Sequence, residues 1–482
     1  MKMHKWFLLL TALACGSLVH AQTTPEPLEL DEVLAASSQH FPRILRSLAQ
    51  RRGAAGRAME AEGAFDLVFS ADGFGRLSGF YDGIAAEGTV RQRIRPLGAS
   101  LYAGYKLSDG TFPIYEDVNF TNTGGAAKVG VLFSLMRDRN FDRERFDELD
   151  ARLNLREAEF DLLLTRVGVQ QRAHIAYWQW VTHGRKLRIY QNLLRIALER
   201  QDGLEEQVRQ GALANIFLTE NLQNITRRQT LVTAAERDLA IAANDLALYY
   251  RDANGLPLTA VEEQLPPGAP LNEIGNLVVT DAAAMSDALA RRPELAILRT
   301  AIEREQNRIA LSRNDLKPRL DFNVEAQSGL GSVAEGGVSR DSNDTIVGFT
   351  FSVPLQRRAE RGRLMRSQAA LEARRAEQRL TEEQIQLEVR NVLLDLRVSR
   401  DLLLLAAQEV QQSEIMRASE LRRFQSGASD FFLVNVREET AADARIRLLQ
   451  AELNTRIARA NYDAATVDLE RLGIMSGDVF RD

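Results

Sequence analysis

Two uninterrupted helical stretches of nearly 70 residues each constrain the fold more than any other feature of this sequence. They span residues 141–209 and 359–425, and at a rise of 1.5 Å per residue each would be about 100 Å long. No compact single domain is that tall. The chain is therefore expected to be an elongated molecule built along two long helices.

Apolar residues recur along the helical segments at steps of three, four and seven. Examples from the second long stretch are Leu380, Leu387, Leu394, Val398, Leu402 and Leu405. Steps that average near 3.5 residues indicate helices that wind gently about their neighbours. Two shorter helices are expected to flank each long one, such as residues 30–62 and 216–249 in the first half of the chain. Stacked end to end, the two shorter helices would be about as long as one long helix.

The chain contains two copies of one unit. Residues 130–135 can be aligned with residues 348–353, and residues 210–212 with residues 426–428. The offsets are 218 residues (348 minus 130) and 216 residues (427 minus 211). Nearly equal offsets over such a distance indicate an internal duplication.

The first copy is longer than the second. A third match, residues 41–43 with residues 292–294, has an offset of 251, so the first copy holds about 33 extra residues (251 minus 218) before Gly130. These fall within residues 73–125, which are rich in Gly, Asp, Ser, Thr and Asn. That composition predicts strand ends and a long exposed loop, where insertions are tolerated.

Each copy also contains two segments in which apolar and polar residues alternate, as expected for strands with one apolar face. In the second copy these are residues 319–327 and 345–355, which are predicted to form a hairpin. In the first copy the corresponding strands are expected at residues 65–74 and 129–135. Residues 101–107 are an alternative for the second of these strands. Four strands per chain are therefore expected.

These patterns divide the chain into a leader, two repeats and the segments around them. The expected divisions are a signal peptide (1–21), a first helix-strand-strand-helix repeat (22–258), an inter-repeat equatorial segment (259–285), a second such repeat (286–474) and a C-terminal tail (475–482).

The N-terminus predicts an exported protein. Two lysines precede an apolar run over residues 6–19, and Ala21 is the small residue expected before a cleavage site. The run is shorter than the roughly 20 residues that a membrane-spanning anchor needs. Lipidation at Cys15, the only cysteine, is the alternative. Cleavage after Ala21 would leave no cysteine, which excludes disulfides and thiolate metal sites, and the net charge of −5 disfavours nucleic acid as a partner.

Four exported strands with one apolar face can lie in lipid only as part of a closed barrel, because open sheet edges would leave backbone groups without hydrogen bonds. Membrane barrels begin at about eight strands, so one chain cannot close one. Three chains would supply about twelve strands. A soluble sandwich with attached helices is the alternative.

Four motifs carry a resemblance to a known family that covers essentially the whole mature chain. They are residues 288–295 (ALARRPEL), 317–320 (KPRL), 348–355 (GFTFSVPL) and 424–427 (FQSG). Together with the duplication, they make the sequence similar to the TolC-like outer-membrane efflux proteins, or outer membrane factors.

The resemblance implies a mixed α+β membrane protein that assembles as a homotrimer. Long antiparallel helices would form a periplasmic α-barrel, and four strands per protomer would join a shared transmembrane β-barrel of twelve strands. The implied function is a passive outer-membrane channel in tripartite efflux or type I secretion. Its partners would be a periplasmic adaptor (membrane fusion) protein, an inner-membrane transporter and outer-membrane lipid.

In that family the glycine of the FQSG motif turns the helical hairpin at the periplasmic tip, which constricts the tube and faces the adaptor. Glycine suits such a turn because it adopts positive φ without steric cost, and Asn and Asp suit the start of the returning helix. The tip and adaptor-docking residues that the resemblance implies are Gly211, Asn215, Phe424, Gly427 and Asp430.

Two further sets of candidate residues follow. Known members place gating aspartates six and nine residues after the tip glycine, where this sequence has Leu433 and Val436. The nearest acids, which are the candidate gate residues, are Glu220, Asp430 and Glu438. The residues expected to face lipid, from the alternation in the strand at 319–327, are Leu320, Phe322 and Val324.

Other functions find less support in the sequence. Residues 329–334 match a dinucleotide-binding fingerprint, but a Gly- and Asp-rich segment follows instead of the required helix. The histidines are scattered and no catalytic constellation stands out, so neither a metal, a cofactor nor an enzymatic activity is expected. The alternative function is a periplasmic adaptor, which usually has one helical hairpin, followed by an exported enzyme with a coiled-coil extension.

Overall fold

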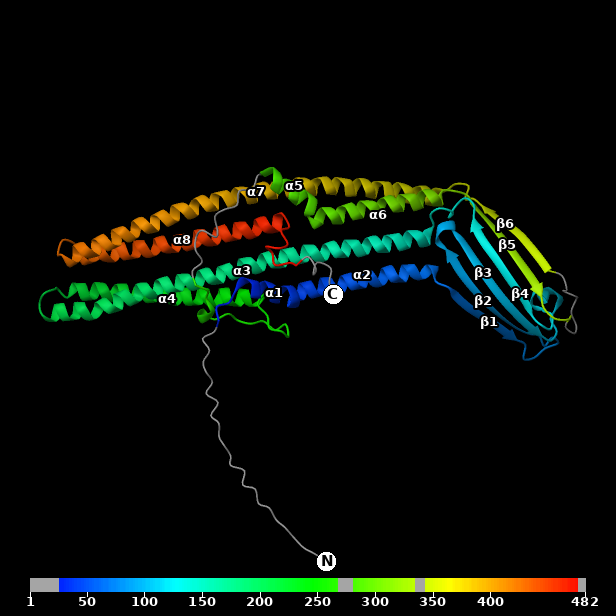
Figure 1. Ribbon diagram of the computed structural model, residues 1–482, viewed down its shortest axis with the longest axis horizontal. Coiled ribbons are helices and arrows are strands. Elements are labelled where there is room, and N and C mark those ends of the chain that lie inside the picture. The colour runs from blue at the N-terminus through cyan, green and yellow to red at the C-terminus, as the bar shows by residue number, and fades with distance from the viewer. Residues whose placement is uncertain (1–25, 268–280, 334–342, 476–482) are drawn as a thin grey trace, which may run out of the picture.

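The computed structural model is an elongated molecule with a β-sheet at one end and two helical hairpins that reach away from it (Figure 1). It describes residues 26–267, 281–333 and 343–475. The predicted signal peptide with Cys15, most of the predicted tail and part of the equatorial segment lie outside the described residues.

Two helices run the length of the helical part, as the sequence predicts. They are α3 (Arg143–Arg209, 67 residues) and α7 (Arg358–Gln425, 68 residues). The shorter helices are α1 (Leu30–His40), α2 (Pro42–Glu62), α4 (Ile216–Ala247), α5 (Asp281–Arg291), α6 (Pro293–Asp315) and α8 (Phe431–Ala465). Helices α2 and α4 both pack against α3, and α6 and α8 both pack against α7. Figure 1 shows each pair lying roughly end to end along its long helix, as expected.

The helix predicted over residues 30–62 is in fact two helices, α1 and α2. The break is at Phe41, whose backbone is extended (φ −70°, ψ 122°). Pro42 lacks an N–H and crowds the residue before it, which disfavours helical ψ at Phe41. Proline is well placed as the first residue of α2, where the missing N–H would have no helical partner.

The sheet contains six strands, not the four that the sequence predicts. Among the described residues they are β1 (Val68–Gly75), β2 (Ile84–Ile94), β3 (Ala99–Asp109), β4 (Ala126–Ser134), β5 (Arg319–Gly329) and β6 (Asn343–Ser352), each antiparallel to the next. The extra residues of the first copy are not a long loop: they form the hairpin of β2 and β3. This hairpin separates β1 from β4. Residues 101–107, expected only as an alternative to residues 129–135, form part of β3, and both segments are strands.

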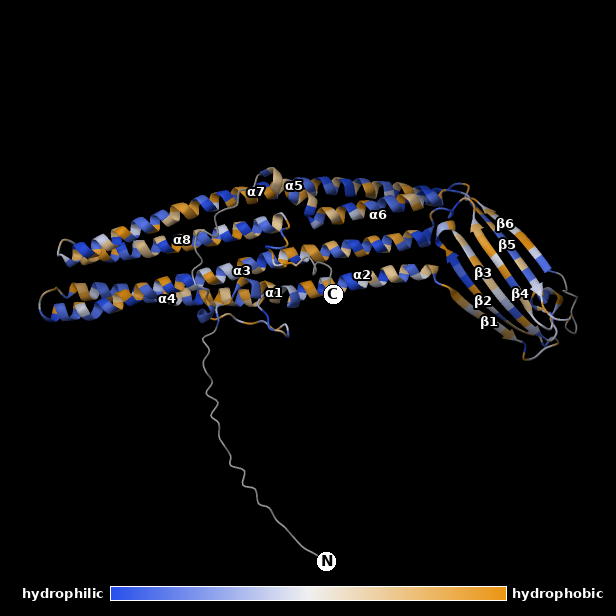
Figure 2. Cartoon of the chain, in the orientation of Figure 1, coloured by the Kyte–Doolittle hydropathy of each residue, from blue (hydrophilic) through white to orange (hydrophobic). Residues whose placement is uncertain are grey.

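The strand register places apolar residues on one face of the sheet. Phe322 on β5 is paired with Phe133 on β4 and with Phe349 on β6. On the opposite face Glu325 accepts a hydrogen bond from Tyr102 of β3 (2.5 Å). Figure 2 shows the resulting alternation of hydrophobic and hydrophilic residues along the strands, as the sequence predicts for β5 and β6.

The helical part has a separate apolar core in each half of the chain. The first surrounds Trp180, where α1, α3 and α4 meet, and the second surrounds Leu295 and Val389, where α5, α6, α7 and α8 meet. The α+β fold class is therefore confirmed, with two repeats that each contain one long and several shorter helices. No helix in the described part of the chain combines the length and the apolar character that crossing a membrane requires.

Candidate functional site

Both helical hairpins turn by the same backbone geometry at the end opposite the sheet. Gly211 follows α3 with φ 76°, and Gly427 follows α7 with φ 75°. The hydrogen bonds of the two turns are Gly211 N to Val208 O (2.9 Å), Ala212 N to Gln207 O (2.9 Å), Gly427 N to Phe424 O (3.0 Å) and Ala428 N to Arg423 O (2.8 Å). This is the Schellman pattern, in which a left-handed residue satisfies the last helical carbonyls. The internal duplication thus extends to individual hydrogen bonds.

The residues that begin the returning helices differ between the two hairpins. Asp430 caps α8, because its carboxylate accepts a hydrogen bond from the Leu433 N–H (2.8 Å). Asn215 stands before α4 but has a helical backbone (φ −59°, ψ −19°), and its side chain makes no cap hydrogen bond. A capping side chain reaches the first helical N–H groups from an extended backbone, which Asn215 lacks.

An aromatic cluster joins the tips of the two hairpins. Phe431 of α8 is 1% exposed. Its ring centroid lies 6.1 Å from that of Phe424 in the FQSG motif and 6.3 Å from that of Phe217 on α4. The guanidinium of Arg200 on α3 lies over the Phe431 ring, 5.3 Å from its centroid. Phe431 therefore ties the α7–α8 tip to the α3–α4 tip.

A buried ion pair lies next to this cluster and also joins the two hairpins. Glu438 of α8 is 3% exposed and Arg228 of α4 is 1% exposed. The Arg228 Nη2 atom lies 3.1 Å from Glu438 Oε2, and Arg200 pairs with the other carboxylate oxygen. Arg228 also donates to the Leu193 carbonyl (2.9 Å). Burial lowers the pKa of Arg228, and the Glu438 carboxylate opposes that shift.

The three candidate gate acids thus have different surroundings. Asp430 is exposed at the start of α8, Glu220 is half-buried on α4, and Glu438 is buried between two arginines of its own chain. A gating role for any of them stays a prediction. Of the three, only Glu438 forms a buried ionic contact between the two hairpins.

Sequence reasoning did not identify Arg228 as the partner of Glu438, although a signal was present. Arg228 stands three residues after Ile225 and four before Val232, in the apolar register of α4. Glu438 stands four residues after Val434 in the buried register of α8. Two opposite charges at helix positions that face the core are expected to pair, because a buried charge without a partner costs free energy.

The residues predicted to face lipid lie on the apolar face of the sheet. Leu320, Phe322 and Val324 alternate along β5 with Asp321 and Asn323. On the opposite, polar face the Asp321 carboxylate accepts a hydrogen bond from Ser134 (2.8 Å) and pairs with Arg319. The register fits lipid contact by the apolar set, which stays a prediction.

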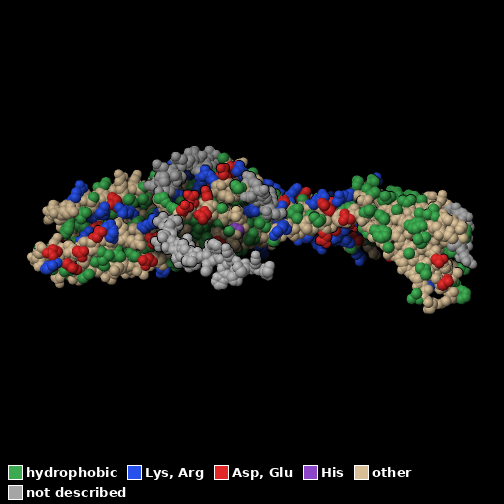
Figure 3. All heavy atoms as spheres, turned by 60° about the horizontal axis from the view of Figure 1, so that its bottom comes forward, with side chains coloured by type: hydrophobic (Ala, Val, Ile, Leu, Met, Phe, Trp, Pro, Cys, Tyr) green, Lys and Arg blue, Asp and Glu red, His purple; other side chains and the backbone are tan. Residues whose placement is uncertain are grey.

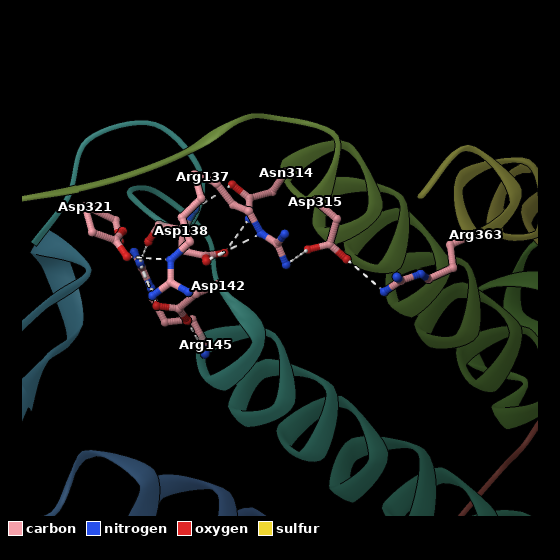
Figure 4. A network of polar contacts seen from close by, with 10 residues as sticks. Arg137, Asp138, Asp142, Arg145, Asn314, Asp315, Asp321 and Arg363 are labelled. Atoms are coloured by element: carbon pink, nitrogen blue, oxygen red, sulfur yellow. Dashed lines mark hydrogen bonds and ion pairs between the residues drawn. The ribbon is translucent and has the colours of Figure 1, made fainter. Parts of the chain in front are cut away.

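A polar network that the sequence did not reveal joins the sheet to the helices (Figure 4). Arg145 at the start of α3 donates to the Asp138 carbonyl (2.8 Å), and the Asp138 carboxylate accepts from Asn314 of α6 (2.8 Å). Asp315 then pairs with Arg137 (3.3 Å) and with Arg363 of α7 (3.4 Å). This junction network holds the base of the sheet on three helices.

The tip geometry leads to a first prediction, that Gly427→Val assembles at the wild-type level but transports poorly. A Cβ at Gly427 would meet nothing within 4 Å, so the cost is backbone strain at positive φ, about 1 to 3 kcal/mol. That is too little to unfold a packed assembly but enough to deform the turn. The yield of the assembled protein and efflux in a strain that lacks its own channel would be measured.

Gly362→Val is the matched control for this variant. Gly362 lies within α7, the helix that Gly427 follows, also has open space around a built Cβ, and is not in the left-handed region. It is expected to assemble and transport as the wild type does. Wild-type transport by Gly427→Val would show that the turn conformation is unimportant.

Comparison with known proteins finds a family match in part of the sequence. Residues 284–466 match the family model described as "Outer membrane efflux protein", and all four motifs lie within that range. No curated protein sequence matches the chain.

Solved structures of outer-membrane proteins share the fold over nearly the whole chain. The open-state MtrE outer membrane channel of Neisseria gonorrhoeae has 14% identity and a TM-score of 0.63, and covers 91% of this chain and 88% of its own. The CmeC outer membrane channel of Campylobacter jejuni has 11% identity and a TM-score of 0.61, and covers 100% and 99%. VceC of Vibrio cholerae has 16% identity and a TM-score of 0.59, and covers 94% and 97%.

These identities are too low to show more than a shared fold, whereas the matched domain rests on the sequence itself. The resemblance predicted from the motifs is confirmed. Residues 284–466 match the outer membrane efflux protein family in sequence, and the chain has the fold of solved outer-membrane channels over nearly its whole length.

Proposed function

We propose that the chain is one of three identical subunits of a passive outer-membrane channel. The observation that carries the proposal is the placing of two different surfaces at opposite ends of one long molecule (Figure 1). At one end is a sheet with an apolar face and two open edges, and at the other are two exposed hairpin turns. A sheet that lies in lipid must close, so several chains must share one barrel.

The helices would then form a tube below the barrel, in the periplasm. The tube would receive solutes or proteins from an inner-membrane transporter through a periplasmic adaptor, in efflux or type I secretion. The turns at Gly211 and Gly427 would meet the adaptor, with Asn215, Phe424 and Asp430 around them. The channel would be passive, because the transporter supplies the energy. No catalysis is proposed for it.

The periplasmic adaptor, the alternative from sequence, fits less well. Adaptors usually carry one helical hairpin, whereas this chain has two, related by duplication and joined to one membrane-type sheet. The match of residues 284–466 to the outer membrane efflux protein family also favours a channel over an adaptor.

Mass and conductance test the proposal together. Light scattering of the detergent-solubilised protein, with the detergent mass subtracted, is expected to give three chains per particle, and the particle is expected to conduct ions in planar bilayers. A particle of one chain, or a trimer that is soluble without detergent and does not conduct, would contradict it.

A further inference from the structure

The hairpin of β2 and β3 has the dimensions of two membrane-spanning strands. Each strand has 11 residues, within the roughly 9 to 11 that a tilted strand needs to cross a membrane. Strand β2 pairs with β1 from Val68 to Gly75, and β3 pairs with β4 from Ala99 to Lys106. The hairpin is thus inserted between β1 and β4, which are not paired with each other.

Both faces of the sheet continue across the inserted strands. On the apolar face one row of paired residues runs through Leu101, Val131, Val324 and Val347, from β3 to β6. On the polar face Glu87 of β2 pairs with Lys106 of β3 (3.3 Å) and with Lys128 of β4. Figure 3 shows hydrophobic side chains gathered over the sheet, while charged ones are spread over the helices.

The turn between β2 and β3 lies close against Asp138 of the junction network of Figure 4. Gly98 in this turn has φ 57°, and a Cβ there would lie 2.5 Å from the Asp138 carbonyl oxygen. Beside it, Arg95 pairs with Glu148 of α3 (3.2 Å) and lies over the Phe65 ring, 4.8 Å from its centroid. A loosely attached loop would not need so close a fit.

The two open edges of the sheet belong to β1 and β6. Because the number of strands is even and each is antiparallel to the next, β6 of one chain can pair with β1 of a second copy without breaking the alternation. The occupant that fits each open edge is therefore another copy of this chain.

We infer that all six strands enter the barrel wall, so that three chains close a barrel of about eighteen strands, not the twelve expected from four strands each. This rests on the proposed function. Barrel diameter grows roughly linearly with strand number, so the pore through the membrane is about 1.5 times as wide as with twelve strands. The channel's outer section then admits cargo bulkier than a twelve-stranded pore passes, such as polypeptides that are partly folded.

Disulfide cross-linking tests where the hairpin lies in the assembled protein. The residues Ser70 and Thr89 are paired between β1 and β2, and Ala103 and Val129 between β3 and β4. Paired residues have Cα separations of about 4.5 to 5.5 Å, which suits a disulfide. The variants S70C/T89C and A103C/V129C, oxidised in isolated outer membranes, are both expected to form intrachain disulfides in trimers. The variant S70C/G130C, which probes pairing of β1 with β4, is not.

Pore size gives a second readout. Deletion of residues 82–110 removes both strands and keeps the alternation of the remaining four. Neutral polyethylene glycols of graded size, added on the outer side of a planar bilayer, enter the barrel and lower its conductance. The intact trimer is expected to admit polymers about 1.5 times as large in diameter as the deletion variant admits.

The two tests separate this inference from the proposed function. If the particle is not a trimer or does not conduct, the proposed function fails. If it is a conducting trimer in which S70C/G130C forms the disulfide and the other two pairs do not, the hairpin lies outside the wall and the inference is wrong. The cross-links decide this even if the deletion variant fails to assemble.

Discussion

Replacing Phe322 with arginine is expected to remove most of the assembled protein from the outer membrane. Phe322 lies between Phe133, at 5.2 Å between ring centroids, and Phe349 on the apolar face of the sheet. A charged residue on the lipid face of a barrel costs about 2 to 4 kcal/mol near the midplane of the membrane. Each subunit of the proposed trimer would carry that cost.

Asn323→Arg is the matched control for Phe322→Arg, because the next residue along β5 points to the opposite, polar face. An added charge there would meet water and is expected to change passage through the pore more than assembly. The trimer in the outer-membrane fraction is measured for both variants. Equal yields would show that the apolar face of β5 does not contact lipid.

Glu438→Gln is expected to destabilise the helical part by about 3 to 5 kcal/mol, because it leaves the buried guanidinium of Arg228 without an anion. The same change would weaken the buried ionic contact by which Glu438 of α8 joins the two hairpins. The variant is therefore expected to unfold at a lower temperature, followed by circular dichroism, and to conduct more in planar bilayers.

The neighbouring residue provides a close control. Glu439 pairs with Arg227 (3.1 Å), but the Arg227 side chain is 66% exposed. Exposed ion pairs contribute about 0 to 1 kcal/mol, so Glu439→Gln is expected to unfold and conduct nearly as the wild type does. A Glu438→Gln protein as stable as the Glu439→Gln protein would mean that the buried pair contributes nothing to holding the hairpins together.

The long helices and their turns could be predicted from the sequence because local signals suffice there. Apolar residues at helical spacing fix α3 and α7 to within two residues of the predicted ranges, and a glycine followed by a small residue fixes each turn. The alternation in β5 is equally local: one residue in two is apolar, and only one register buries that set. The duplication then repeats these signals in the other half of the chain.

The number of strands and the partners of the buried charges were decided by tertiary structure. The apolar face of β2 carries the alternate residues Ile84, Ala86, Gly88, Val90, Gln92 and Ile94, so small residues and a glutamine interrupt the strand pattern. They form a strand because β1 and β3 supply hydrogen bonds on both sides. Arg228 and Glu438 can be recognised as buried from their helical registers, but they are far apart in sequence. Their pairing exists only because the two hairpins pack together, which no local pattern encodes.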